Sequence, residues 1–199
     1  MALKTICVFG ASSATLDQSY YDQAHELGKM LAQASYDLVY GAGNLGIMGA
    51  VARGVKEGQG KITGVIPSFL NMEGVAYPHC DELIVTETMR ERKAEMEKRA
   101  DGFIALPGGY GTFEELLEVL TLKQLSRHNK PIVIVNTNGY YDALLSQMEI
   151  CIEQNFAKPS CRELYAVCEN GQQTIEYLKN YVPKEIELKV FCYVDKGKA

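Results

Sequence analysis

The residues best suited to bind and act on an anion lie in one short stretch of this 199-residue chain. Residues 102–106 form an apolar run that predicts a buried strand, and Pro107 ends it. Three glycines follow within four residues, namely Gly108, Gly109 and Gly111. Thr112 then opens a periodic run that predicts a helix. Because the first N–H groups of a helix have no internal partner and carry partial positive charge, a glycine turn at this point suits a phosphate.

Thr112 and Glu115 also have a purely structural interpretation. The pattern Thr-x-x-Glu before an apolar run is that of a capping box, in which the two side chains satisfy backbone N–H groups at the helix start. On that interpretation neither residue needs a ligand. A simple helix start does not require a proline and three glycines, however, and this cluster favours the anion-binding interpretation.

Four charged side chains could act beside such a turn. Glu114 and Glu115 lie in the first helical turn, and since adjacent helix residues point about 100° apart, they cannot face a pocket equally. Glu115 is the better candidate, because a carboxylate beside a phosphate site suits activation of water or stabilisation of a developing sugar cation. Arg92 and Lys93 lie on the charged helix predicted at 88–99. They either belong to a solvated face or, in the case of Arg92, clamp a phosphate or sugar oxygen.

The pattern Gly41-x-Gly43-x-x-Gly46 is that of a dinucleotide-binding loop. The first strand of such a fold normally carries it, whereas here it follows the second predicted strand, and no acidic residue falls at 62–67, where the next strand ends. We therefore do not expect NAD or FAD, and no GxxxxGK[ST] P-loop occurs either. The loop either lines a nucleotide-sized pocket, with Gly43 and Asn44 against the ligand, or is a tight structural turn.

These residues must be positioned by a succession of strands and helices. Apolar runs predict strands at 4–10, 37–40, 62–66, 83–85, 102–106, 132–136 and 164–167. Helical spacing predicts helices at 20–34, 47–57, 88–99, 112–127, 140–155 and 172–180. Thr88 and Glu91 fit a capping box for the third helix.

This alternation predicts an α/β fold, a Rossmann-like, doubly wound and mainly parallel sheet with helices on both faces. We expect a single domain over residues 1–199, with 184–199 as an edge strand or a loose tail. In such sheets ligands bind beyond the carboxyl ends of the strands, where nearly all the glycine-rich loops of this chain fall. Ser12, in the small-residue loop after the first strand, either donates to the ligand or acts as a cap.

Composition argues against several classes of function. The net charge is −5 and the pI about 5.3, so we expect no general affinity for nucleic acid. No apolar run approaches the roughly 20 residues of a membrane span, and the first residues lack a signal-peptide layout. The six cysteines form no CxxC pair and the three histidines are far apart. We therefore expect reduced thiols, a cytoplasmic location, no metal and no cofactor.

Three stretches, in this order, resemble the Lonely Guy (LOG) family. Residues 107–115 read Pro-Gly-Gly-Tyr-Gly-Thr-Phe-Glu-Glu, which matches the family motif PGGxGTxxE. Residues 89–96, Met-Arg-Glu-Arg-Lys-Ala-Glu-Met, resemble a second motif with its Arg-Lys pair. Residues 40–49 resemble a third motif, which usually has a glycine where Ala42 stands. LOG proteins are cytokinin riboside 5′-monophosphate phosphoribohydrolases, and the resemblance runs from about residue 4 to 156.

The resemblance implies a homodimer that cleaves the N-glycosidic bond of a nucleoside 5′-monophosphate, releasing free base and ribose 5-phosphate. It implies that Arg92 and Glu115 are catalytic, Arg92 orienting and neutralising the substrate and Glu115 acting on water or on the oxocarbenium-like transition state. The residues expected to bind substrate are Lys93, Gly108, Gly109, Tyr110, Gly111, Thr112, Glu114, Thr121, Gly43, Asn44 and Ser12. Glu73 is the expected counterpart of an upstream family glutamate, at a spacing longer by one residue.

Other functions compete with this one. The family is often labelled lysine decarboxylase, but nothing in the chain marks a pyridoxal-phosphate lysine. A non-enzymatic nucleotide or cofactor carrier, or a sensor, could use the same fold and glycine turn, although a carrier would not need Arg92 and Glu115 together. The sequence leaves open whether AMP or an N6-modified adenosine monophosphate is preferred.

Overall fold

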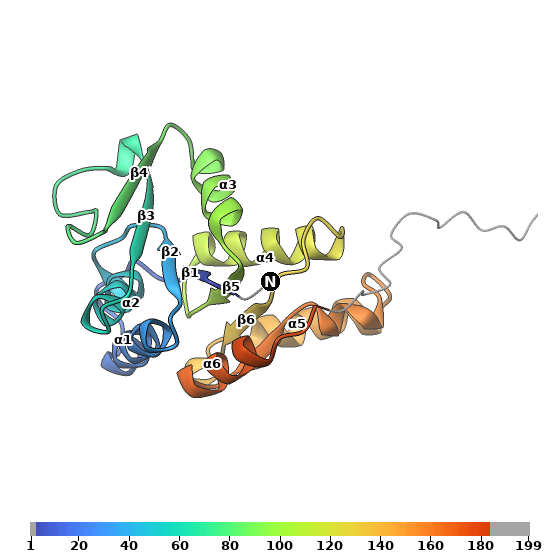
Figure 1. Cartoon of the computed structure of the whole chain (residues 1–199). Coiled ribbons are helices and arrows are strands. Elements are labelled where there is room, and N and C mark those ends of the chain that lie inside the picture. Colours follow the sequence, from blue (N-terminus) through green and yellow to red (C-terminus); the bar gives the residue numbers. More distant parts are fainter. Residues whose placement is uncertain (1–2, 184–199) are drawn as a thin grey trace, which may run out of the picture.

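A computed structural model describes residues 3–183 of the protein. Its sheet contains β1 (Thr5–Phe9), β2 (Asp37–Tyr40), β3 (Ile62–Pro67), β4 (Glu82–Thr86), β5 (Gly102–Ala105), β6 (Ile132–Val135) and β7 (Ala166–Cys168). Its helices are α1 (Gln18–Gln33), α2 (Gly46–Glu57), α3 (Met89–Arg99), α4 (Tyr110–Gln124), α5 (Asp142–Glu153) and α6 (Gly171–Asn180). The elements alternate as predicted (Figure 1).

All seven strands are parallel, in the order β4-β3-β2-β1-β5-β6-β7. The chain builds outward from β1 to β4, then returns to the other side of β1 and builds outward again through β5, β6 and β7. The doubly wound α/β fold predicted from the sequence is therefore confirmed. The two halves meet between β1 and β5, the topological switch point where such sheets bind ligands.

Helices cover both faces of the sheet (Figure 1), because its strands are apolar on both sides. One core joins α1, α2 and α6 to strand residues such as Ile6, Val8 and Leu38. The other core joins α3, α4 and α5 to Cys7, Phe9 and the other alternate strand residues. The two helices that carry the charged candidates, α3 and α4, therefore lie on the same face of the sheet.

Several element ends differ from the predicted ones. Helix α4 begins at Tyr110 rather than Thr112, and α5 begins at Asp142 after a short 3₁₀ turn at Thr137–Gly139. Strand β7 begins two residues later and ends one residue later than expected. The capping box of Thr88 and Glu91 is confirmed, because the Thr88 hydroxyl accepts from Glu91 N and the Glu91 carboxylate accepts from Thr88 N. The predicted edge strand or tail at 184–199 lies outside the described residues.

Candidate active site

The loops after β1 and β5 lie together at the switch point. The N–H of Ala11 donates to the carbonyl oxygen of Pro107 at 3.1 Å, which ties the small-residue loop to the glycine turn. Ser12, the next residue, is exposed, and its backbone lies against Gly46 at the start of α2. The β1, β2 and β5 loops are thus contiguous, which brings Ser12, the Gly41–Gly46 loop and the Pro107–Gly111 turn to one end of the sheet.

The capping-box interpretation of Thr112 and Glu115 is wrong. The N-terminal cap of α4 is Gly109, which offers no side-chain hydrogen bond, and Thr112 lies inside the first helical turn. Because the helix starts two residues earlier than predicted, Glu115 falls in its second turn, out of reach of the cap. Its carboxylate is bound to Arg92 instead. Neither Thr112 nor Glu115 therefore caps the helix.

Arg92 and Glu115 form a buried ion pair between α3 and α4. Arg92 Nη1 lies 2.7 Å from Glu115 Oε1, and the two side chains are 8% and 10% exposed. Arg92 Nε donates to the carbonyl oxygen of Val65, within β3, at 3.2 Å. The guanidinium crosses the backbone of Gly41, where an added Cβ would lie 1.7 Å from Arg92 Nη2. Gly41 therefore makes room for the arginine.

Burial raises the pKa of the Glu115 carboxyl above its ordinary value, and the positive charge of Arg92 opposes this only in part. A carboxylate with a raised pKa accepts a proton more readily at neutral pH than an exposed glutamate does. Glu115 is thus chemically suited to act as a base, with Arg92 positioned to hold its charge and orientation.

Lys93 forms a second set of ion pairs beside the first. Its Nζ lies 2.5 Å from Glu114 Oε1 and 2.7 Å from Glu118 Oε2. Burial alone would lower the pKa of Lys93, but the hydrogen bonds to the two glutamates outweigh it and the pKa is raised. Lys93 is thus held as a cation next to the Arg92–Glu115 pair, and Glu114 faces Lys93 rather than Arg92, as expected for adjacent helix residues.

The three glycines of the turn have different surroundings. An added Cβ at Gly108 would lie 2.1 Å from Thr112 Oγ1, so Gly108 lets the chain fold back over Thr112. At Gly109 and Gly111 an added Cβ would meet no atom within 4 Å. Packing within the described residues therefore explains Gly108 but neither of the other two.

Backbone donors lie free at this turn. Among residues 3–183, the N–H groups of Gly109, Tyr110, Gly111 and Thr112 have no hydrogen-bond acceptor. Tyr110 itself is 92% exposed. The turn can thus offer a row of donors to an anion, as the sequence predicts.

The loop after β2 is a built structure rather than a dinucleotide loop of the usual kind. Gly43 is buried and pairs with Ala76, while the N–H of Asn44 donates to the carbonyl oxygen of Val75 at 2.9 Å. Ala42 has a positive φ of 60°, the left-handed region where glycine is the easier residue. Gly43 and Asn44 thus belong to the same loop as Gly41, whose backbone lies against Arg92.

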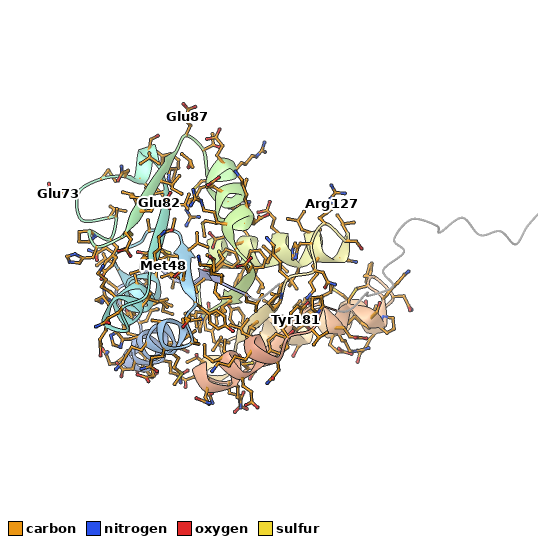
Figure 2. All side chains as sticks on the ribbon, in the orientation of Figure 1. Met48, Glu73, Glu82, Glu87, Arg127 and Tyr181 are labelled. Atoms are coloured by element: carbon orange, nitrogen blue, oxygen red, sulfur yellow. The ribbon has the colours of Figure 1, made fainter. Side chains whose placement is uncertain are left out.

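Glu73 and Thr121 are not brought to the Arg92–Glu115 pair. Glu73 is exposed on the loop after β3, at the outer margin of the molecule (Figure 2). Thr121 lies six residues beyond Glu115 on α4, about 9 Å along the axis and about 120° around it. Its hydroxyl donates to Leu117 O at 2.7 Å, and it lines an apolar hollow between α4 and α5.

Sequence reasoning missed the residues that hold the site from behind. The Tyr140 and Tyr141 hydroxyls bond carbonyl oxygens of the glycine turn, and the carbonyl oxygen of Val65 holds Arg92. The signal for the tyrosines was their place just after the strand that neighbours β5, since the loops after neighbouring parallel strands meet. A backbone carbonyl such as that of Val65 carries no residue-type signal at all.

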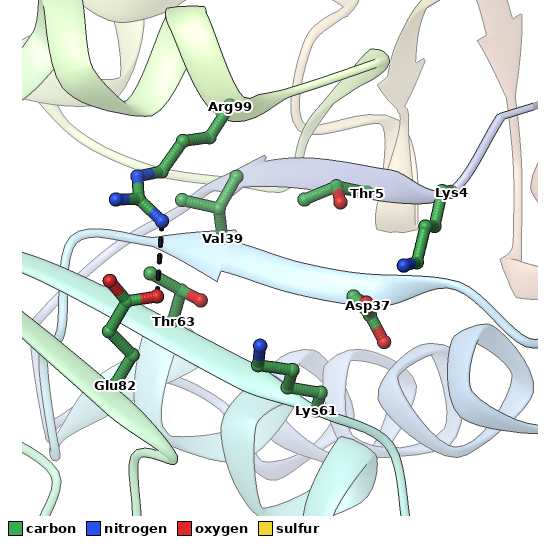
Figure 3. Close-up of a pocket in the computed structure, with 8 residues that line it drawn as sticks. All are labelled: Lys4, Thr5, Asp37, Val39, Lys61, Thr63, Glu82 and Arg99. Atoms are coloured by element: carbon green, nitrogen blue, oxygen red, sulfur yellow. Dashed lines mark hydrogen bonds and ion pairs between the residues drawn. The ribbon is translucent and has the colours of Figure 1, made fainter.

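A second hollow lies at the opposite end of the sheet, where the strands begin (Figure 3). Its charged lining residues are Lys4, Asp37, Lys61, Glu82 and Arg99. Arg99 Nη1 donates to Glu82 Oε2 at 3.0 Å. This hollow contains none of the predicted site residues.

The structure of residues 3–183 also bears on metal binding and on membrane insertion. No three His, Cys, Asp or Glu side chains in this part of the chain gather as metal ligands would. Its helices include none that is both long and apolar enough to cross a bilayer. The five cysteines it contains are free thiols.

Known proteins are similar in sequence to this protein over most of its length. Residues 48–178 match a family described as "Possible lysine decarboxylase". Cytokinin riboside 5′-monophosphate phosphoribohydrolase LOG2 of Arabidopsis thaliana is 41% identical over 91% of this chain and 85% of its own length. The LOG1 protein of the same plant, which has the same activity in its name, is 43% identical over the same shares.

Solved structures of lower identity share the fold. The molybdenum cofactor binding protein of Rippkaea orientalis superimposes with a TM-score of 0.70 at 22% identity, covering 90% of this chain and 97% of that protein. The molybdenum cofactor carrier protein of Chlamydomonas reinhardtii gives 0.68 at 24% identity, covering 89% and 96%. At such identities the likeness extends to the arrangement of strands and helices, not to function.

Proposed function

This chain belongs to the LOG family, and from that premise we propose that it hydrolyses the N-glycosidic bond of an adenosine 5′-monophosphate, releasing the free base and ribose 5-phosphate. The observation that carries the proposal is the buried Arg92–Glu115 pair, held 2.7 Å apart beside a glycine turn with free N–H groups. A phosphate site next to a carboxylate that can act as a base suits the hydrolysis of a phosphorylated nucleoside.

In the proposed mechanism, the N–H groups of residues 109–112 bind the 5′-phosphate, and Lys93 adds a positive charge nearby. Arg92 orients and neutralises the substrate. Glu115 takes a proton from water as the water oxygen bonds to C1′ of the ribose, or stabilises the oxocarbenium-like transition state. The bond from C1′ to the base nitrogen breaks, and the base leaves with the bonding electrons and takes up a proton from solvent, while Glu115 releases to solvent the proton that it took from water.

The burial of the pair contributes to this chemistry. A charge in a water-poor site interacts more strongly with a developing opposite charge than it would in bulk water. Because Arg92 is also bound to the carbonyl oxygen of Val65, its position does not depend on Glu115 alone. Each group therefore meets the substrate in a fixed orientation.

The identity of the base forms a finer part of the proposal. The named relatives act on cytokinin riboside monophosphates, so an N6-modified adenosine monophosphate is our first candidate and AMP, as for an AMP nucleosidase, the second. Incubation of the pure protein with isopentenyladenosine monophosphate and with AMP, followed by chromatography of free base, measures both rates. Base release from either substrate supports the proposed hydrolysis, and the ratio of rates identifies the preferred base.

The decisive control is Glu115→Gln, which keeps the size of the side chain and removes its charge. Wild-type turnover by this variant would refute the catalytic role of Glu115. Tight nucleotide binding by the wild type with no base release over hours would replace the hydrolase by a non-enzymatic carrier or sensor.

We further propose that the protein is a homodimer. Thr121, which the family resemblance implicates in substrate binding, lines the apolar hollow between α4 and α5 and is not brought to the Arg92–Glu115 pair of the same chain. Leu117 lines the same hollow and is 44% exposed. A second copy of the chain packed on this face would cover Leu117. Thr121 of one protomer would then lie near the Arg92–Glu115 pair of its partner. Light scattering should give twice the chain mass of 22.1 kDa, and Leu117→Asp should shift it toward the monomer.

A cytoplasmic location is the remaining part of the proposal. The five cysteines within residues 3–183 are free thiols, which supports this location because reducing compartments keep thiols unpaired. Fractionation of cells that express the tagged protein tests it.

A further inference from the structure

The first three carbonyl oxygens of the turn between β5 and α4 are held from outside the turn, whereas the fourth, that of Gly109, accepts from the N–H of Phe113 in α4. Tyr141 Oη donates to the oxygen of Leu106 at 2.7 Å, and Tyr140 Oη donates to the oxygen of Gly108 at 2.6 Å. Between them, the oxygen of Pro107 accepts from the N–H of Ala11 at 3.1 Å. Three consecutive peptide oxygens thus each point at a donor in the surrounding scaffold.

Fixing these oxygens also fixes the donors of the turn. A trans peptide is planar, with its C=O and the following N–H pointing in opposite directions. The bond from Tyr140 to the oxygen of Gly108 therefore sets the direction of the Gly109 N–H, away from the tyrosine. Gly109 begins the row of N–H groups that have no acceptor within residues 3–183. The tyrosine hydroxyls that bind the carbonyl oxygens of the turn therefore also determine where its free N–H groups point.

The two tyrosines are themselves held firmly. The N–H of Tyr141 donates to Asn136 Oδ1 at 2.7 Å, and Asn136 Nδ2 donates to Asp142 Oδ1 at 2.7 Å. Tyr141 is fully buried. The ring of Tyr140 packs edge-on against Tyr141 at 5.1 Å and against Tyr20 of α1 at 6.2 Å. The hydroxyls therefore reach the turn from a rigid base.

We propose that Tyr140 and Tyr141 are positioning residues for the 5′-phosphate, which act by holding the turn so that its N–H groups converge on that group. The inference deepens the proposed function and rests on it for the identity of the ligand. Glycines at 108 and 109 leave the turn many backbone conformations, and glycine is the residue that most needs such external restraint. Without the tyrosine hydroxyls, the peptide between Gly108 and Gly109 is free to rotate and its N–H leaves the row.

Removal of each hydroxyl alone tests the inference. The variants are Tyr140→Phe and Tyr141→Phe, and the matched control is Tyr181→Phe, whose hydroxyl also donates to a loop carbonyl, that of Asn129 at 3.1 Å, but outside the site. Calorimetric titration gives the Kd of ribose 5-phosphate, which contains the phosphate, and of adenosine, which lacks it. Base release from the nucleoside monophosphate is measured on the same samples.

Each site variant should bind ribose 5-phosphate about tenfold more weakly, the size expected for a lost hydrogen bond, and bind adenosine as the wild type does. Tyr181→Phe should change neither Kd. Wild-type affinity of both site variants for ribose 5-phosphate overturns the inference, and so does an equal loss for both ligands, which marks a general structural role. Because Tyr140 is partly exposed, its variant is expected to fold even if Tyr141→Phe does not.

The proposed function can fail separately. Tyrosine-dependent binding of ribose 5-phosphate by a wild type that releases no base leaves the positioning role supported and refutes only the hydrolase. Failure of the wild type to bind ribose 5-phosphate overturns the positioning role as well.

Discussion

Replacement of Gly111 by alanine should make the protein more stable and less active. Gly111 lies in the first turn of α4, its φ is not positive, and an added Cβ would meet no atom within 4 Å. Glycine in a helix costs about 0.5–1 kcal/mol relative to alanine because the unfolded chain loses more freedom, and the lower figure suits a first-turn position. A gain of about 0.5 kcal/mol corresponds to a Tm rise of about 1–2 °C in a chain of this size.

The expected loss of activity follows from the proposed phosphate site. An added Cβ at Gly111 would meet no protein atom within 4 Å, so the methyl group would extend into the open space beside the turn where the phosphate is proposed to bind. Loss of one hydrogen bond to a charged phosphate costs about 1.5–3 kcal/mol, so kcat/KM for the nucleoside monophosphate should fall about 10- to 100-fold. Urea denaturation measures the first effect, and chromatographic base release the second.

Two comparisons show whether the reasoning holds. Binding of adenosine, which lacks the phosphate, should be unchanged in Gly111→Ala. Gly108→Ala should lose both stability and activity, because its Cβ would lie 2.1 Å from Thr112 Oγ1. If Gly111→Ala turned over the nucleoside monophosphate at the wild-type rate, the open glycine would not serve ligand access and the assignment of the phosphate to this turn would be refuted.

Further predictions concern the charged residues. Glu115→Gln should retain nucleotide binding and lose about 10²- to 10⁴-fold in base release, measured by chromatography and titration. The acid limb of the pH profile of kcat/KM should have its midpoint above the ordinary glutamate pKa of about 4.3, because burial raises the pKa of Glu115 and the protonated form is not a base; a midpoint at or below that value contradicts this. The same shift means that the contribution of Glu115 to stability is full below the unfolded pKa and is lost as the pH rises through the folded pKa, which urea denaturation across pH 4–8 should show for the wild type and not for Glu115→Gln. Lys93→Met should destabilise the fold by about 1–2 kcal/mol, since Glu114 and Glu118 lose their partner; a stability equal to that of the wild type would mean that solvent already screens these pairs.

The sequence predicted the fold in outline because hydrophobic period and glycine position are local properties. Each strand and the helix that follows it can be recognised from a stretch of about 30 residues. The alternation of strands and helices then implies a parallel sheet. The exact first residue of α4, by contrast, is not determined by the neighbouring sequence alone. Thr112 offered a good cap, but the β1 loop and the tyrosines hold the turn so that Gly109 caps instead. Tertiary contacts overrode a local signal that is correct in isolation.

Site residues divided in the same way. The PGGxGTxxE stretch and the Arg-Lys pair could be selected by residue type, and the structure places Arg92 against Glu115. The positions of Glu73 and Thr121 in the sequence do not indicate which way their side chains point. In the structure both lie away from the Arg92–Glu115 pair. Tyr140 and Tyr141 were read only as part of a helix, because a hydroxyl that bonds a distant carbonyl leaves no pattern in the neighbouring sequence.

The Arg92–Glu115 pair also joins two helices that are separated in the chain by β5. Truncation of one partner of a buried ion pair typically costs about 3–5 kcal/mol, a large part of the 5–15 kcal/mol that stabilises most domains. In a living cell, Arg92→Ala would therefore reduce the amount of protein as well as its chemistry, since unfolded chains are removed by proteases. A loss of function observed in cells that carry this variant would therefore combine a lower amount of protein with a lower catalytic rate. Glu115→Gln keeps the size of the side chain but leaves the buried Arg92 charge without its ionic partner, so genetic studies of this site need protein levels measured in the same cells for every variant.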